Sequence, residues 1–147
     1  MTDSQDEKVD GAKIAAQILM RLAPEAQERI IQAMGENAPL VLKKVQEKML
    51  TLEHLAELTP QSIQTLLREV DHKDVVAALN IASPAVKQAV FQSIPAGKRQ
   101  IIEEDLALAG GISPVEVEGA KKRIVVKLDE LQEKGKIRSD EKKGTWA

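Results

Sequence analysis

The clearest pattern in the chain is an apolar stripe near its C-terminal end. Apolar residues recur there at steps of three and four, which places them on one face of a helix. The stripe consists of Val117, Ala120, Ile124, Leu128 and Leu131. We therefore expect this helix to have one buried face. Gly135 follows the stripe, and glycine is the residue that most often ends a helix in the left-handed conformation.

Prolines indicate where the other helices begin. Each of the six prolines starts a segment with helical spacing, where its missing N–H would have no acceptor within the helix. Thr59, Ser83 and Ser113 directly precede prolines and can cap the helix through their hydroxyls. The predicted helices span residues 12–22, 24–34, 38–50, 60–70, 72–81, 84–94, 95–109 and 114–134. Between them, residues 51–58 are predicted to be a short helical turn or a linker.

The composition narrows the fold class. The chain has 147 residues, of which 43% are hydrophobic and 30% charged, as in ordinary soluble globular proteins. Phe91 and Trp146 are its only aromatic residues, so the core must be aliphatic. Such a core suits helices packed on helices and argues against a β-sandwich, which relies on aromatic and β-branched strands. We expect an all-α fold.

The composition also excludes several classes of function. The chain has no cysteine, so no disulfide, thiolate or zinc–sulfur site can form. A net charge of −2 creates no field that favours nucleic acid or an anionic membrane. The first residues lack the apolar run of a signal peptide, and the longest apolar runs are far too short to span a membrane. A cytoplasmic protein that does not bind nucleic acid is the simplest interpretation.

An internal repeat relates two parts of the chain. The apolar positions Ile18, Leu19, Leu22, Ile31 and Met34 recur at a constant offset as Leu66, Leu67, Val70, Leu79 and Ala82. Similar turns follow, over residues 38–41 and 83–86. Three-helix units of this length resemble armadillo or HEAT repeats, which stack because one unit alone cannot bury its apolar face. The alternative is that short helices joined by proline turns look alike by default.

The segment over residues 95–109 carries a group of charges. Its predicted apolar face consists of Ile101, Ile102, Leu106 and Ala109. Glu103 and Glu104 lie beside or opposite this face. Asp105 falls within it, so its carboxylate needs a partner or a position at the edge. Arg99 and Glu103 have the i,i+4 spacing of a helical ion pair. On pattern alone, an ordinary solvated helix face explains these charges.

The other candidates for chemistry are weak. A basic cluster consists of Lys121, Lys122, Arg123 and Lys127, without the aromatic residues that stack on bases, so a solvated face is favoured. His54 and His72 have acidic neighbours but not the spacing of a metal site, which favours surface or capping roles. Asp71 is a candidate N-cap. The chain lacks a nucleophile elbow and a phosphate loop, so we expect no catalytic, metal-binding or cofactor-binding residues.

Short motifs along the chain match those of one known family. They occur at residues 15–19 (AAQIL), 49–52 (MLTL), 59–71 (TPQSIQTLLREVD), 104–106 (EDL) and 117–121 (VEGAK). The match over residues 59–71 is the most specific. Together these motifs make the chain, from about Gly11 to Ile137, resemble the last third of the flagellar motor switch protein FliG.

The resemblance implies an all-α fold of armadillo- or HEAT-like short-helix repeats plus a C-terminal helical subdomain. It divides the chain into a disordered tail over 1–11, an armadillo-like unit over 12–50, a hinge or linker over 51–58, a FliG C-terminal-like domain over 59–138 and a flexible tail over 139–147. The family's hinge motif corresponds to Met49, Leu50, Thr51 and Leu52. The helical units are expected to re-stack about this hinge.

The resemblance also implies a surface that binds partners. In the family, one helix of the C-terminal subdomain directs charged residues toward the membrane-embedded stator. Its acidic positions correspond to Glu104 and Asp105, and Lys98 and Arg99 complete the charged ridge. The family's own basic positions are replaced here by Asn80, Gly97 and Ala109.

The implied function is that of a non-enzymatic rotor component of the flagellar switch, or a FliG-like accessory protein, in motility and chemotaxis. The expected partners are other switch proteins, the cytoplasmic region of the stator and stacked copies of the chain itself. No cofactor is expected, and the place of action is the cytoplasm, at most peripheral to the inner membrane. Two alternatives stand beside this one. They are a helical adaptor that lost its motor function, and a cation-binding regulatory module like the helical N-domain of MgtE-type magnesium transporters.

Overall fold

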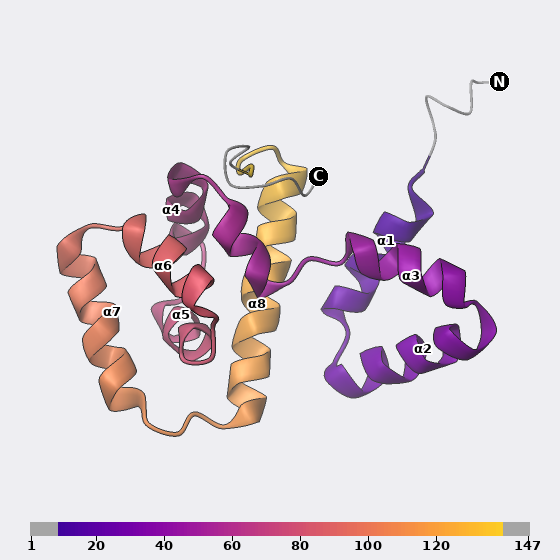
Figure 1. Ribbon diagram of the computed structural model, residues 1–147, viewed down its shortest axis with the longest axis horizontal. Coiled ribbons are helices and arrows are strands. Elements are labelled where there is room, and N and C mark those ends of the chain that lie inside the picture. Colours follow the sequence, from indigo (N-terminus) through magenta and orange to yellow (C-terminus); the bar gives the residue numbers. More distant parts are fainter. Residues whose placement is uncertain (1–8, 140–147) are drawn as a thin grey trace. The chain divides into compact units, whose positions relative to one another are not determined.

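The computed structural model describes residues 9–139, and throughout this range the regular elements are helices (Figure 1). The chain forms two compact units, Met1–Met49 and Leu50–Ala147. The first contains α1 (Gly11–Arg21), α2 (Pro24–Asn37) and α3 (Pro39–Lys48). The second contains the 3-10 helix η1 (Leu52–Glu57), α4 (Pro60–Arg68), α5 (His72–Leu79), α6 (Pro84–Gln92), α7 (Ala96–Ala109) and α8 (Pro114–Glu133). The all-α prediction is confirmed for the described residues.

Proline and hydroxyl caps begin most of these helices as the sequence predicts. Five of the six prolines are the first residue of a helix. Pro95 is the exception, because it is the N-cap of α7 and the helix begins one residue later. The hydroxyls of Thr59, Ser83 and Ser113 each accept a hydrogen bond from the backbone N–H three residues on, at 3.1–3.3 Å. Asp71 is the N-cap of α5, but its side chain makes no capping hydrogen bond.

The first unit has a small core. Ala16 and Leu19 of α1 pack with Val45 of α3, and all three are buried. α2 packs against α3 but buries none of its own residues. Several large apolar side chains of this unit are exposed instead: Ile14, Ile18, Ile30, Leu40 and Val41.

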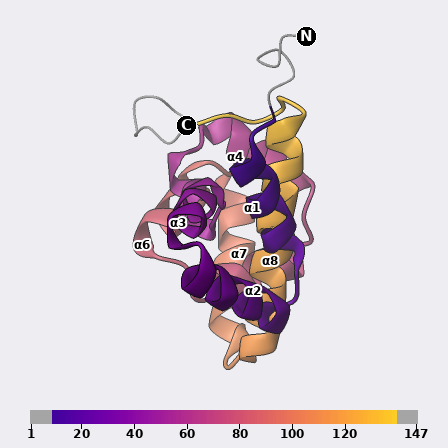
Figure 2. The same ribbon diagram turned by 90° about the vertical axis from the view of Figure 1, so that its right-hand side faces the viewer.

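The second unit has a larger and continuous core. It draws buried residues from every helix of the unit, and Leu58, Ile63, Leu66 and Leu128 are completely enclosed. α8, the longest helix with 20 residues, runs along this unit and packs against α5, α4 and η1 (Figures 1 and 2). All five residues of the predicted α8 stripe are buried. Gly135 ends this helix with φ at +70°, as predicted.

Residues 51–58 are part of the second unit, and of the two alternatives predicted for them, a short helical turn or a linker, the structure has the turn, η1. Leu52 and Leu55 of η1, with Leu58, point into the second core because a 3-10 helix places every third residue on one side. Thr51 and His54 form a reciprocal capping box that fixes the start of η1. The boundary between the two units lies one residue before the predicted linker region, between Met49 and Leu50.

At each end, the structure describes a few residues that the sequence assigned to the tails. The Asp10 carboxylate caps α1 by accepting a hydrogen bond from the Lys13 backbone N–H at 3.0 Å, so the helix begins at Gly11. At the other end, Ser139 forms an isolated bridge with Leu58. These contacts hold residues that were assigned to disordered or flexible tails. Residues 1–8 and 140–147 lie outside the described part of the chain.

Candidate partner-binding surface

α7 is the least buried helix of the second unit, and the charged residues singled out from the sequence lie on it. It begins after Pro95 and ends at Gly110, whose φ of +60° suits glycine. Of its 14 residues only Ile102 is buried, and the helix packs mainly against α5. The predicted apolar face is narrower than expected, because Ile101 is exposed. α7 therefore offers most of its surface to solvent.

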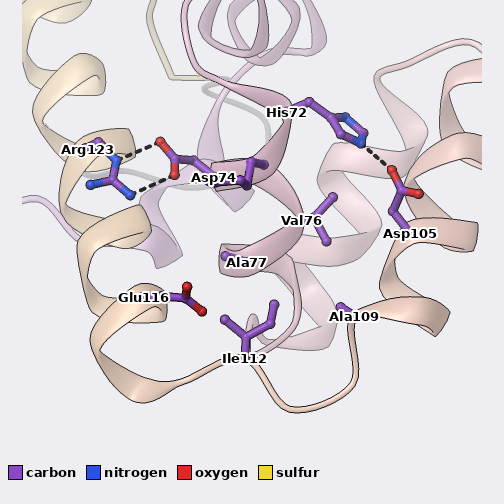
Figure 3. Close-up of a pocket in the computed structure, with 10 residues that line it drawn as sticks. His72, Asp74, Val76, Ala77, Asp105, Ala109, Ile112, Glu116 and Arg123 are labelled. Carbon is purple, nitrogen blue, oxygen red and sulfur yellow. Dashed lines mark hydrogen bonds and ion pairs between the residues drawn. The ribbon is translucent and has the colours of Figure 1, made fainter.

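Asp105 has the partner that its position in the sequence requires. Nε2 of His72, at the start of α5, lies 2.6 Å from Oδ2 of Asp105 (Figure 3). The two side chains are 46% and 42% exposed, so the pair lies at the edge of the α5–α7 contact rather than in the core. His72 thus has a specific structural partner, which the sequence alone did not reveal.

Unlike Asp105, the other three residues of the predicted ridge form no ion pair with α5. Nε of Arg99 lies 3.1 Å from Oε2 of Glu103, and its guanidinium stands 5.0 Å from the centre of the Phe91 ring. Glu104 accepts a hydrogen bond of 3.2 Å from the side chain of Gln100, one turn earlier on α7. Lys98 is exposed and forms no ion pair with any described residue.

The ridge residues do not form a single cluster. At 100° per residue, Glu104 lies about 200° around the helix from the buried Ile102, which directs it away from the unit. Asp105 and Lys98 are seven residues apart and therefore share one side of α7, near the contact with α5. The structure thus separates Glu104, which faces solvent, from Asp105, which faces His72.

A second ion pair, which the sequence analysis missed, joins α5 to α8. Two nitrogens of Arg123, Nε and Nη2, donate hydrogen bonds of 2.8 and 2.9 Å to the two carboxylate oxygens of Asp74 (Figure 3). The Asp74 side chain is only 8% exposed, whereas that of Arg123 is 61% exposed. This hydrogen-bonded carboxylate raises the pKa of the Arg123 guanidinium above its ordinary value.

Gly119 lies inside α8 beside the Arg123 guanidinium. A glycine inside a helix costs about 0.5–1 kcal/mol relative to alanine, so its presence calls for a packing reason. A Cβ at position 119 would lie 3.3 Å from Nη1 of Arg123. The missing side chain therefore leaves room for the guanidinium that neutralises Asp74.

An open pocket of about 460 Å³ lies among α5, α7 and α8 (Figure 3). Its apolar lining consists of Val76, Ala77, Ala109 and Ile112. The two ion pairs described above lie on its walls, together with Lys73 and Glu116. Its charged lining thus includes three carboxylates, two cations and the imidazole of His72.

Among the described residues, few side chains that could bind a metal ion lie close together. Throughout residues 9–139, no three His, Asp or Glu side chains come together in a way that could hold a metal ion. Within the same range, no helix combines the length and the hydropathy that crossing a bilayer requires. What the arrangement can provide is a set of charged and apolar contacts for another protein.

Comparison with known proteins agrees with the motifs found in the sequence. Residues 32–138 match the family model of the FliG C-terminal domain. The flagellar motor switch protein FliG of Aquifex aeolicus is 29% identical over 130 residues, which cover 88% of this chain and 40% of that protein. FliG of Thermotoga maritima is 28% identical over 130 residues, covering 88% and 39%. The chain therefore spans about 40% of the length of these curated relatives.

Solved structures of similar fold are also structures of FliG. A crystal structure of a FliG fragment from H. pylori covers 93% of this chain and 65% of that fragment, with a TM-score of 0.75. Its 22% sequence identity supports a shared fold and nothing more. The match to the structure of full-length FliG from Aquifex aeolicus covers 90% of this chain and 42% of the FliG chain, with 28% identity and a TM-score of 0.59.

Proposed function

Because its residues 32–138 match the FliG C-terminal domain, the chain belongs to that family, and we propose that it is a non-enzymatic component of the flagellar motor switch. It works through protein–protein contacts in motility. Its place is the cytoplasm, at the base of the flagellum. The relatives that support this proposal are all named as motor switch proteins, although the chain spans less than half of each.

The observation that carries the proposal is the exposure of α7. A helix of 14 residues that buries a single side chain contributes little to the core of its own unit. Its outward charge, Glu104, is available to a partner that carries complementary charge, and Lys98 is exposed at the side of the helix. By the family resemblance, this partner is the cytoplasmic region of the stator. Arg99 lies on another side of α7, where it pairs with Glu103.

Exposed apolar residues on the first unit support a second kind of contact. Isolated exposed apolar side chains are common on proteins, but here the three helices of one unit carry five large ones. Copies of the chain stack through these side chains, as repeat units do when one unit cannot bury its own face. Other switch proteins are the alternative occupants of this surface.

The hinge proposal now concerns a shorter segment. Met49 packs with the first core, whereas Leu50 and Leu52 pack with the second. Thr51 caps η1. We place the pivot at the Met49–Leu50 junction. Hydrogen exchange tests this: the amides next to the junction exchange fast and those of Leu55 and Leu58 slowly, and protection equal to the core across residues 49–58 would remove the hinge.

Deleting the gene in its host tests the proposed function as a whole. Electron microscopy counts the filaments, and tracking measures swimming. Cells without filaments indicate a role in assembling the switch, and cells with filaments that do not turn indicate a role in torque. Normal swimming contradicts the motor function and leaves the helical adaptor, which the residues Asn80, Gly97 and Ala109 at the family's basic positions would favour.

The comparisons do not favour a regulatory module of the MgtE type, which would bind divalent cations. Titration calorimetry with Mg²⁺ separates this function from the proposed one. We expect no binding heat, because neighbouring carboxylates on the described helices are not gathered in threes.

A further inference from the structure

The two neighbouring acidic residues of α7 are held in different ways. The partner of Glu104 is Gln100 on the same helix, so their hydrogen bond does not link α7 to the rest of the unit. The partner of Asp105 is His72 on α5, 33 residues earlier in the chain. Figure 3 shows the imidazole and the carboxylate facing each other across the gap between the two helices. Only the bond of Asp105 can influence where α7 lies.

The apolar contact that holds α7 is small. Ile102 is its one buried residue, and Leu106, the next apolar residue on that side, is only partly buried. Beyond Asp105, the last turn of α7 lines the open pocket through Ala109 rather than packing tightly on α5. The His72–Asp105 bond therefore lies between Ile102, the one buried residue of α7, and the end of the helix, where residues are at most partly buried.

The hydrogen bond has a defined direction. An ionised carboxylate only accepts hydrogen bonds, so Nε2 of His72 carries the hydrogen and donates it. Both side chains are partly exposed, and ion pairs of this kind contribute little to global stability. A contact of this strength cannot hold a domain together. It can, however, shift the position of a helix end whose other contacts are few.

We propose that His72 is a positioning residue for α7, which holds its C-terminal half against α5 and keeps Asp105 from outside partners. While the bond is made, a cationic partner meets Glu104 on the outer face and cannot use Asp105. When the bond opens, Asp105 becomes a second acidic contact. The part of this inference that concerns the partner rests on the proposed function, whereas the part that concerns α7 does not.

Hydrogen exchange of the purified chain tests the positioning role. We expect His72→Ala to speed exchange of the amides over residues 103–109 about two- to fivefold, the factor that matches about 0.5–1 kcal/mol for a partly exposed pair. In an Asp105→Ala background, the same His72 substitution should have no further effect. This double-mutant cycle cancels the helix propensity that alanine adds at position 105.

Glu103→Ala provides the matched background. It removes a carboxylate of the same helix that pairs only with Arg99, four residues before it. His72→Ala should still speed exchange of residues 103–109 in this background. Equal effects of His72→Ala with and without Asp105 would overturn the positioning role, and so would faster exchange spread evenly over the whole second unit.

A rescue experiment tests whether His72 withholds Asp105 from the partner. Motility is measured in cells whose only copy of the chain carries Glu104→Ala, with and without His72→Ala. We expect the added His72 substitution to restore part of the lost swimming, and to restore none when Asp105→Ala is also present. Absence of rescue would overturn this role of His72. If Glu104→Ala swims normally, the proposed function of the ridge fails, while the exchange experiment still decides the positioning of α7.

Discussion

The two units have a similar predicted spacing of apolar residues but bury these residues to very different extents. By the repeat predicted from the sequence, α1, α2 and α3 of the first unit correspond to α4, α5 and α6 of the second. Ile18 on α1 is 56% exposed, whereas its counterpart Leu66 on α4 is completely buried. α2 buries no residue, whereas the shorter α5 buries six. The same spacing of apolar residues therefore produces an open face in one unit and a core in the other.

The difference comes from what covers the three helices. In the second unit, η1 packs against α6, and α8 packs against α4 and α5. In residues 9–49, the described part of the first unit, no further helix covers α1, α2 and α3. A three-helix repeat cannot bury its apolar face by itself, and it becomes stable by stacking on a neighbour. The comparison therefore indicates that the second unit supports its own fold, whereas the first needs a partner to reach similar stability.

Matched leucine substitutions in the two cores test this comparison with the largest expected effect. Leu128→Ala removes a completely enclosed side chain of the second unit and should cost about 2–5 kcal/mol in the free energy of unfolding. Leu19→Ala in the first unit should cost less, because few neighbours surround the space that it leaves. Both losses in the free energy of unfolding are measured in urea, with hydrogen exchange reporting the unfolding of each unit separately. Equal losses in the two units would contradict the comparison.

The Asp74–Arg123 pair predicts the next largest effect. Arg123→Met removes both hydrogen bonds and leaves a mostly buried carboxylate without its cation, so we expect a loss of about 1–3 kcal/mol. Lys121→Met, two residues nearer the start of α8, breaks an exposed pair with Glu118 and should change stability by less than about 0.5 kcal/mol. Similar losses for the two substitutions, measured by urea unfolding, would show that the buried pair contributes nothing special.

The N-cap of α1 predicts a smaller effect that depends on pH. The Lys13 N–H, helped by Lys48, lowers the pKa of the Asp10 carboxyl. A carboxyl with a lowered pKa in the folded state stabilises that state above its unfolded pKa, and this contribution is lost as the pH falls through the folded pKa. Asp10→Ala should therefore speed exchange in the first turn of α1 near neutral pH but not in acid.

Asp10→Asn is the control for this effect. Asparagine caps helices about as well as aspartate but carries no charge that titrates. The variant should keep protection of the first turn close to the original, without a change between neutral and acidic pH. A pH dependence that persists in Asp10→Asn would show that another group is responsible.

The helix boundaries were predictable because the signals that set them are local. Two of these signals act within one helical turn. One is a proline at the first helical position, and the other is a capping hydroxyl, which accepts a hydrogen bond from the backbone N–H three residues later, as at Thr59 and Ser113. The buried stripe of α8 was predictable for the same reason, since 20 residues of regular spacing define a face. For residues 51–58 the sequence left a short helical turn and a linker as alternatives, and the leucines at every third position, which form the 3-10 helix η1, were the signal that favours the turn.

The ion pairs were not predictable in this way. His72 and Asp105 are 33 residues apart, and Asp74 and Arg123 are 49 apart. No local pattern relates residues at such distances, because only the packing of α5 against α7 and α8 brings them together. The sequence could state that Asp105 needed a partner, but it could not say which side chain would supply it.

The most direct test of the account is the rotation of tethered cells whose only copy of the chain carries Glu104→Lys. Glu118→Lys is the matched control, since it makes the same charge change at an exposed residue of α8. We expect filaments in both strains, with rotation slowed or stopped in Glu104→Lys and normal in Glu118→Lys. Normal rotation in both strains would contradict the claim that α7 is the surface through which the chain acts.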